Sequence, residues 1–506
     1  MLVNLESYIS PWEVLIRAFI LLLPVVLLAV CVSVLQARII HVPADSSTIQ
    51  GGINGAVDGD TVMIAPGTYY ENRIELLGKA ITVMSTSPED PNVVTSTIID
   101  GNYEFNSIIF LNHSNEDTTS IIAGLTIRNG DQSDGGGVYC VGSSPMVKNC
   151  WITGNNAEGG YGGGVYCSDS HATFIDCKIS NNRAEGDGGG IFVQWNASPT
   201  FRNCVISENY SGTDQGGGIY CIGDGRFLGC IISNNFHGGI STSGGMYDRC
   251  LISDNPGTGV ECYGSQFTYC VIKGNTRGGI RSGDDVALIN CTFTENTTGG
   301  SGSALHCVGS TLLENCIIWG NAAPGIVDES GELEVYYCDI EGGWPGEGNI
   351  DEDPMFVSSN KDDYRLLWSS PCIDTGHPDA LDADSTRSDM GAYYFNQNDF
   401  LTLYVTPDTS EVAPGGQLGV TYTAINRWDS PEACWLFSQV FLPGGSALNV
   451  LGPNQYTLPA NYTAQVRLNH PVPNLAPAGV YEYWSRVGMP PGTLYDEDSF
   501  KFWIVE

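Results

Sequence analysis

Basic residues are scarce in this chain. Its 506 residues include 21 lysines and arginines against 57 aspartates and glutamates, and the formal net charge at pH 7 is -36. A protein of this charge repels the phosphates of DNA and RNA and the headgroups of anionic membranes. The composition therefore argues against nucleic-acid partners. It suits a soluble acidic surface, the interpretation we favour, or an extracellular protein that binds Ca²⁺.

Several local motifs are also missing. No two cysteines have the CxxC spacing of a zinc site. The histidines lack the spacing of a metal site, and no glycine-rich phosphate loop precedes a helix. These absences argue against a zinc centre and against a phosphate-loop nucleotide site.

What the chain does have is a repeat with a short period. Nine cysteines recur every 20 to 27 residues, each followed two residues later by isoleucine or, once, phenylalanine. The first eight are also followed, five residues later, by asparagine. The nine cysteines of this ladder are Cys150, Cys177, Cys204, Cys230, Cys250, Cys270, Cys291, Cys316 and Cys338. This period predicts a parallel β-helix with one coil per repeat and asparagines stacked at a turn.

A second strand precedes each ladder cysteine by about ten residues, as in the GGGVYC motifs that end at Cys140 and Cys167. Alternation turns every second side chain outward. The outward row consists of Tyr139, Tyr166, Phe192, Tyr220, Ser241, Glu261, Arg281 and His306. We expect its aromatic residues to form an exposed strip that binds sugar rings or a partner, with Glu261 and His306 beside it. The alternative is a ladder that only shields the sheet.

The shortest coils lie near residues 230 to 290, between longer neighbours, and predict a groove. A lyase that acts on acidic sugars needs a base and a positive charge. Lys273 and Arg281 are the candidates for the base, provided that a neighbour lowers the pKa. Glu261, Asp284 and Asp285 are candidate ligands of Ca²⁺. The alternative is a row of salt bridges between coils.

Two further features of the sequence call for an interpretation. Asp382, Asp384 and Asp389 have oxygen ligands at a spacing that a calcium loop uses, although the full EF-hand pattern is absent.

An apolar outward row also flanks the cysteine ladder: Trp151, Val205, Ile231, Leu251, Val271 and Ile317. Six outward apolar residues predict a covered face, with loops or a C-terminal domain as the cover.

The fifteen cysteines from Cys140 to Cys372 leave two interpretations open. Both strands of a coil carry cysteine at 140/150, 167/177, 221/230, 262/270 and 307/316, so disulfides within a coil are conceivable. A column of reduced, buried cysteines is the other interpretation, because a free cysteine behaves as a small hydrophobic residue. We favour the reduced column.

Composition changes along the chain indicate three parts. Residues 1–37 contain an uncharged apolar run at 18–35 and predict a signal peptide or a signal anchor. Residues 38–395 form the solenoid, with a helix capped by the segment that ends at Thr48 and a turn-rich C-terminal seal at 351–395. Residues 396–506 alternate between polar and apolar and predict an immunoglobulin-like or fibronectin-like β-sandwich.

Two segments resemble known proteins. HVPADSSTIQGGINGAVDGDTVMIAPGTYYEN is similar to the opening of secreted bacterial right-handed parallel β-helix proteins of the pectate-lyase-like superfamily. DYRLLWSSPCIDTG, with the later DMGAYYF, resembles the closing motif of large bacterial surface β-helix proteins. The hydrolase signatures of that superfamily are not reproduced: Asp284-Asp285 stands alone, and the basic tripeptide is missing. The resemblance implies a fold and carries no catalytic residue over.

The sequence thus predicts an all-β protein, a right-handed parallel β-helix followed by a small β-sandwich. Its expected task is to bind polysaccharide or another cell-surface component along the rod, as a secreted or surface-anchored monomer. A Ca²⁺-dependent lyase of acidic glycans and an adhesin or structural stalk are the alternatives. Contact with a membrane is expected only through the N-terminal segment.

Overall fold

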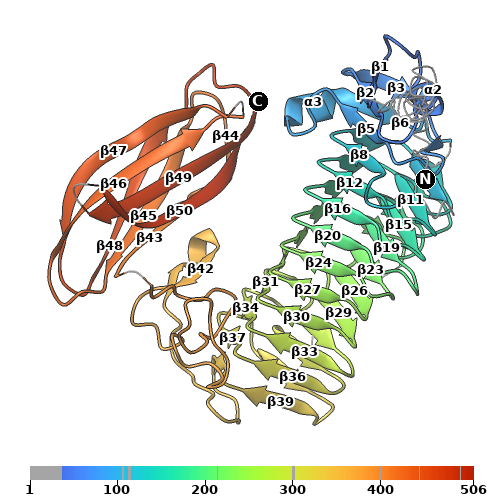
Figure 1. Ribbon diagram of the computed structural model, residues 1–506. Helices are drawn as coiled ribbons and strands as arrows, with labels where there is room; N and C mark the ends of the chain where they lie inside the picture. Colours follow the sequence, from blue (N-terminus) through green and yellow to red (C-terminus); the bar gives the residue numbers. More distant parts are fainter. Residues whose placement is uncertain are drawn as a thin grey trace, which may run out of the picture.

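The computed structural model describes residues 37–104, 108–111, 116–213, 215–298, 302–398, 400–443, 445–489 and 492–505. Figure 1 shows a rod of stacked coils, a turn-rich segment at the C-terminal end of the rod, and a separate sandwich beside it. The apolar run at residues 18–35 lies outside the described residues. Within the described residues, no helix is long and apolar enough to cross a membrane.

Each coil of the rod supplies one strand in turn to three parallel sheets, which we name C, A and B in the order of the chain. Equivalent residues pair in register from coil to coil, as Val138 pairs with Val165 and Ile152 with Ile179. A parallel β-helix is thereby confirmed.

Sheet A begins at the N-terminal end of the rod and comprises β1 (Ile39–Val42), β2 (Thr61–Ile64), β5 (Thr82–Ser85), β8 (Ile121–Ala123), β12 (Met146–Lys148), β16 (Thr173–Ile175), β20 (Thr200–Arg202), β24 (Arg226–Leu228), β27 (Met246–Asp248), β30 (Gln266–Thr268), β33 (Val286–Ile289), β36 (Thr311–Glu314) and β39 (Leu333–Tyr336). Sheet B comprises β3 (Gly67–Tyr70), β6 (Thr97–Asp100), β9 (Thr126–Arg128), β13 (Trp151–Thr153), β17 (Lys178–Ser180), β21 (Val205–Ser207), β25 (Ile231–Ser233), β28 (Leu251–Ser253), β31 (Val271–Lys273), β34 (Thr292–Thr294), β37 (Ile317–Ile318) and β40 (Asp339–Ile340).

Sheet C comprises β4 (Ile74–Glu75), β7 (Ile108–Leu111), β11 (Val138–Val141), β15 (Val165–Ser168), β19 (Ile191–Val193), β23 (Ile219–Cys221), β26 (Ile240–Ser243), β29 (Val260–Tyr263), β32 (Ile280–Ser282), β35 (Leu305–Cys307) and β38 (Ile326–Asp328). A short sheet between B and C comprises β10 (Asp131–Gln132), β14 (Asn156–Ala157), β18 (Arg183–Ala184) and β22 (Tyr210–Ser211).

The asparagines after sheet B form a buried hydrogen-bonded ladder. The amide of Asn182 donates to Oδ1 of Asn209, and the amide of Asn209 donates in turn to Oδ1 of Asn235, at 3.1 and 3.0 Å. Each amide also donates to a carbonyl of the preceding coil, as Asn209 does to Ile179 at 2.9 Å. The predicted stacking of asparagines at a turn is confirmed.

Sixteen free cysteines, all buried, lie in the described residues. The ladder cysteines sit immediately before the strands of sheet B, at the corner that follows sheet A. There each thiol donates to a backbone carbonyl, as Cys204 does to Phe174 at 3.6 Å. This arrangement agrees with the reduced column and not with disulfides inside the coils.

Ellman's reagent measures this state of the cysteines directly. We expect essentially no reaction with the native protein, because the thiols are buried, and sixteen reactive thiols from residues 37–506 after unfolding in guanidinium without reductant. Prior alkylation of the native protein serves as the control for accessible thiols. A substantially smaller number after unfolding would reveal disulfides and contradict the reduced column.

The N-terminal end of the rod is covered by a helix. Helix α2 (Ile49–Gly55) is capped by the Thr48 hydroxyl, which accepts from the backbone N–H of Gly51, and it buries Ile49 and Ile53 at the N-terminal end. A second helix, α3 (Pro91–Ser96), lies between β5 and β6. At the other end, the seal contains the 3₁₀ turn η1 (Ser359–Lys361) and the antiparallel pair β41 (Phe356–Ser358) and β42 (Asp363–Leu366).

The C-terminal region forms two antiparallel layers around a common core. One layer orders β43 (Leu401–Pro407), β45 (Gln417–Asn426) and β48 (Tyr462–Pro471). The other orders β44 (Glu411–Val412), β50 (Thr493–Ile504), β49 (Gly479–Met489), β46 (Glu432–Phe441) and β47 (Ala447–Leu458), with β44 parallel to β50. A core that includes Val420, Tyr422 and Tyr483 joins the layers and is consistent with the predicted sandwich.

The seal covers only part of the apolar outward row of sheet B. Val271 packs against Tyr364 and Ala392, and Ile317 packs against Met390. Ile231, in contrast, remains 38% exposed. The predicted cover is therefore the seal, over the C-terminal coils of the row.

Candidate functional site

The aromatic row of sheet C stacks as predicted. The ring centroids of Tyr139 and Tyr166 are 5.1 Å apart, and those of Tyr166 and Phe192, like those of Phe192 and Tyr220, are 5.4 Å apart. Tyr166 and Phe192 are only 8% and 5% exposed, because neighbouring rings cover both of their faces. The expectation of an exposed strip is thus wrong for these two residues, which present edges rather than ring faces.

Charged residues continue this row. Nη1 of Arg281 lies 2.9 Å from Oε1 of Glu261, and Nε2 of His306 lies 3.3 Å from Oε1 of Glu329. The hydrogen bond between Arg281 and Tyr263, together with the charge of Glu261, raises the pKa of the guanidinium. A base would need the opposite shift. These pairs agree with the alternative interpretation of the row, which is a series of salt bridges between coils.

The two candidate bases lie on different sheets. Lys273 is in β31 of sheet B, whereas Arg281 is in β32 of sheet C. The side chain of Lys273 is 9% exposed, and its Nζ lies 2.5 Å from Oδ1 of Asp362 in the seal. The structure therefore does not bring Lys273 and Arg281 into one site.

The carboxylates proposed as calcium ligands are held by protein donors. Oδ1 of Asp284 accepts from the backbone N–H of Ser310, and the backbone N–H of Asp389 donates to Oδ2 of Asp382. Asp389 itself accepts two backbone N–H groups, and Asp384 accepts from Gln397. In the part of the chain that the structure describes, no three Asp, Glu, His or Cys residues are arranged to hold a metal ion. Glu261, Asp284 and Asp285 are one candidate set, and Asp382, Asp384 and Asp389 are the other. A calcium site at either set stays a prediction.

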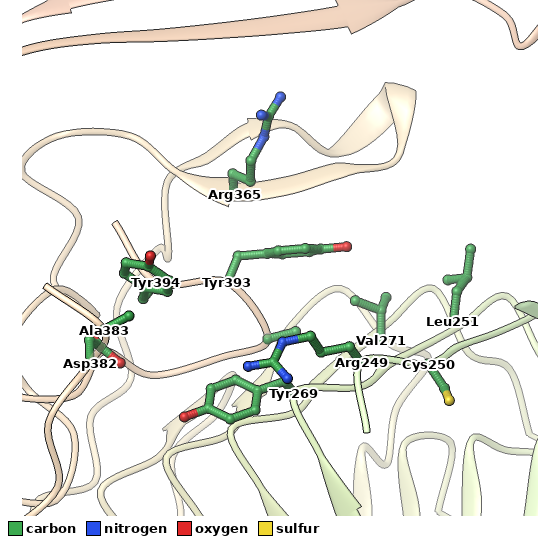
Figure 2. A pocket seen from close by; sticks show the side chains of 11 residues that line it. Arg249, Cys250, Leu251, Tyr269, Val271, Arg365, Asp382, Ala383, Tyr393 and Tyr394 are labelled. Carbon is green, nitrogen blue, oxygen red and sulfur yellow. The ribbon is translucent and has the colours of Figure 1, made fainter. Parts of the chain in front are cut away.

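A pocket of about 270 Å³ lies where the seal meets the corner between sheets A and B. Figure 2 shows its side chains. The rod contributes Arg249, Cys250, Leu251, Tyr269 and Val271, and the seal contributes Arg365, Asp382, Ala383, Ala392, Tyr393 and Tyr394. The pocket lies within the region of short coils, but none of the residues predicted for the groove lines it; of the candidate residues, only Asp382 does.

Corner geometry places Arg249 and Tyr269 at this pocket. The residue before each ladder cysteine has positive φ, and the column is mostly Asn, Asp or Gly, which adopt this conformation most readily. Arg249, Tyr269 and Tyr337 depart from this preference, with φ of 50°, 52° and 52°, and the first two of them line the pocket. The left-handed corner turns their side chains outward, toward the seal.

Several contacts hold the pocket walls. The Arg249 guanidinium lies over the Tyr269 ring, 5.0 Å from its centroid, and pairs with Asp248 at 2.6 Å. Arg365 pairs with Asp363 and Asp498 at 2.8 and 2.6 Å. In Figure 2 the Arg365 side chain rises away from the rod, and the Sγ of Cys250 points away from the pocket. The thiol is therefore not available to a ligand in the pocket.

Tyr393 and Tyr394 are 43% and 39% exposed, and so offer ring surface to a ligand. Leu251 and Val271 supply apolar surface, and Arg249 and Asp382 supply polar groups. A few polar groups among aromatic and aliphatic walls are typical of a small-molecule site. The volume suits a single ring of the size of a sugar.

Two buried aspartates beside the pocket are expected to make stability depend on pH. Burial raises the pKa of Asp382 to about 6 and that of Asp389 to about 7, from 3.8. The folded state therefore keeps protons that the unfolded chain has lost. This contribution is fully present below the unfolded pKa and is lost as the pH rises through the folded values.

We therefore expect the thermal midpoint to decrease as the pH rises from about 4 to about 7. Asp382→Asn, which cannot ionise, should flatten this fall, measured by calorimetry across the pH series. Asp384→Asn is the control: burial acts to raise the pKa of Asp384, but hydrogen bonds from Thr386 and Gln397 outweigh it and lower the pKa. Equal slopes for Asp382→Asn and the unmodified protein would contradict the assignment.

The chain belongs to the family described as right handed beta helix region, which matches residues 91–248 and 241–346, together half of the chain. No curated protein matches it. Two solved structures show partial similarity: the sporulation control protein Spo0M from Bacillus subtilis, and the Pseudomonas fluorescens alkylpurine DNA glycosylase AlkC bound to DNA with an abasic site analogue.

Spo0M is 10% identical, and the similarity covers 21% of this chain and 49% of Spo0M, with a TM-score of 0.18. AlkC is 12% identical over 22% of this chain and 32% of AlkC, also with a TM-score of 0.18. This chain thus spans about half of the first structure and a third of the second. At these scores neither structure carries an argument about fold or function.

Proposed function

We propose that this protein binds a glycan, without cleaving it, in the pocket between the rod and the seal. One observation carries the proposal: Tyr269, Tyr393 and Tyr394 converge on a sugar-sized pocket that also contains Arg249 and Asp382. Aromatic rings pack against the apolar face of a sugar, and charged side chains hydrogen-bond its hydroxyl groups.

The size of the pocket limits what can enter it. A pocket of about 270 Å³ takes one sugar ring, whereas a continuous polysaccharide would need an open groove. The protein therefore recognises the end of a glycan or a side branch. Such a glycan belongs to a cell surface or an extracellular polymer, and we propose that the protein acts there, secreted or anchored through its N-terminal segment.

Affinity electrophoresis of the purified protein through gels that contain different polysaccharides tests the proposal. We expect retardation by at least one polymer, and we expect Tyr269→Ala and Tyr393→Ala each to weaken the affinity about fivefold, since a ring contact contributes about 1 kcal/mol. Tyr70→Ala, at a tyrosine that is 73% exposed in β3, is the matched control and should leave retention unchanged.

The same incubations, with and without Ca²⁺, are followed by the absorbance of unsaturated uronides. Rising absorbance would identify a lyase and overturn non-catalytic binding. If Tyr220→Ala weakens retention and Tyr393→Ala does not, the binding site lies on the aromatic row of sheet C instead. No retention on any polymer would leave the structural stalk as the better account.

A further inference from the structure

A second, smaller hollow lies between the seal and the sandwich. Its volume is about 190 Å³. The seal contributes Arg365 and Tyr394, and Asn396 lies directly after it. Strand β43 contributes Thr402, Leu403 and Tyr404, and β50 contributes Asp496, Glu497 and Asp498. The sandwich thus supplies most of the residues that line this hollow.

The two hollows share walls. Arg365 and Tyr394 line both the pocket on the rod and the hollow on the sandwich. Tyr394 is 39% exposed and therefore has ring surface for a ligand at this boundary. The two hollows are therefore neighbours, with Arg365 and Tyr394 at the boundary between them.

Contacts across the junction and contacts within the sandwich hold the second hollow in shape. Asp498 accepts from Arg365 of the seal at 2.6 Å and from the backbone N–H of Val405 at 2.7 Å. Asp496 accepts from the backbone N–H of Leu403 at 2.8 Å. The Arg365 guanidinium also lies 4.3 Å from the centroid of the Tyr404 ring. The sandwich is therefore fixed at the point where it lines the hollow.

The charge of the second hollow selects against acidic ligands. Asp496, Glu497 and Asp498 line it, and Arg365 is already paired with Asp363 and Asp498. A uronate would meet a negative wall on a chain whose net charge is -36. Carboxylates and the Asn396 amide suit the hydroxyl groups of an uncharged sugar.

We infer that the two hollows are adjoining subsites for an uncharged glycan of at least two residues, with the second residue held by the sandwich. This inference rests on the proposed function, because the first subsite is the glycan pocket. It assigns a role to the sandwich, which completes the site that the rod and the seal begin.

Calorimetric titration of the full chain with paired probes tests the inference: glucose and cellobiose, mannose and mannobiose, N-acetylglucosamine and chitobiose, with digalacturonate as the acidic probe. We expect at least one disaccharide to bind at least about tenfold more tightly than its monosaccharide, with digalacturonate weaker. Asn396→Trp, which fills the second hollow, should abolish the gain of the disaccharide and leave the monosaccharide affinity unchanged.

The outcomes separate the two proposals. Equal affinity for monosaccharide and disaccharide in the unmodified protein overturns the second subsite and leaves the first intact; this comparison needs no variant to fold. Tightest binding of digalacturonate overturns the preference for an uncharged glycan. No binding of any sugar overturns the proposed function and the inference together.

Discussion

Asn209→Ala is expected to destabilise the middle of the rod more than any other single substitution considered for this protein. The Asn209 amide donates to the carbonyl of Ile179 and to Oδ1 of Asn235, and its Oδ1 accepts from the backbone and the side chain of Asn182. Alanine removes four buried hydrogen bonds and leaves the Asn182 backbone N–H without its acceptor, whereas Oδ1 of Asn235 keeps the Asn209 backbone N–H and the Asn182 amide keeps the Ile152 carbonyl. At about 1 kcal/mol for each lost bond, with the added cost of the unsatisfied N–H, the loss should exceed about 3 kcal/mol.

Unfolding in guanidinium, followed by tryptophan fluorescence and circular dichroism, measures this loss. Gln215→Ala is the matched control, because Gln215 is an exposed amide in the next coil. A midpoint for Asn209→Ala equal to that of Gln215→Ala would show that the asparagine ladder does not hold the coils together.

Arg365→Ala is expected to separate the sandwich from the seal. The guanidinium is 23% exposed and lies between Asp363, which is buried, and Asp498. Removal of one partner from a largely buried ion pair leaves uncompensated carboxylates, at a loss of about 3 to 5 kcal/mol. Since Arg365 also lines both hollows, glycan retention should be lost with the junction.

Limited proteolysis near residues 396–400 and affinity electrophoresis together test this expectation. Arg467→Ala provides the control: Arg467 pairs with Asp408, but its side chain is 51% exposed, so its loss should change stability by at most about 1 kcal/mol. Proteolysis and retention that match the unmodified protein would show that Arg365 does not fix the sandwich.

The fold could be predicted because the same strand pattern recurs in coil after coil. Each Cys-x-Ile unit predicts a strand of sheet B, and each GGG motif a strand of sheet C. The regular spacing of residues such as Asn182 and Asn209 places the turn between the strand of sheet B and the following strand of sheet C. In a parallel solenoid, equivalent positions stack directly, so a column in the sequence alignment of repeats becomes a column in space. The sandwich was predictable from alternation alone.

The pocket could not be predicted in the same way. Tyr393 and Tyr394 reach Arg249 and Tyr269 only because the seal folds back over sheet B, and a contact across more than a hundred residues leaves no local pattern. One signal was present in the repeat. The position before each ladder cysteine is mostly Asn, Asp or Gly; Arg249, Tyr269 and Tyr337 are the exceptions, and two of these three line the pocket.

The candidate bases show a second limit of sequence reasoning. Lys273 and Arg281 are eight residues apart, and proximity in the chain suggested one groove. In a coil of about twenty residues, however, eight residues lead from sheet B around the corner to sheet C. The two side chains therefore belong to different faces of the rod, and Lys273 forms an ion pair with Asp362 of the seal.

The central claim is that a glycan binds where the rod, the seal and the sandwich meet. A crystal structure of the protein soaked with the disaccharide that binds most tightly tests it most directly. The account predicts one ring against Tyr269 and Tyr393 and the second beyond Tyr394, beside Asn396. Sugar density confined to the row from Tyr139 to Tyr220, with the junction pocket empty, would contradict the account.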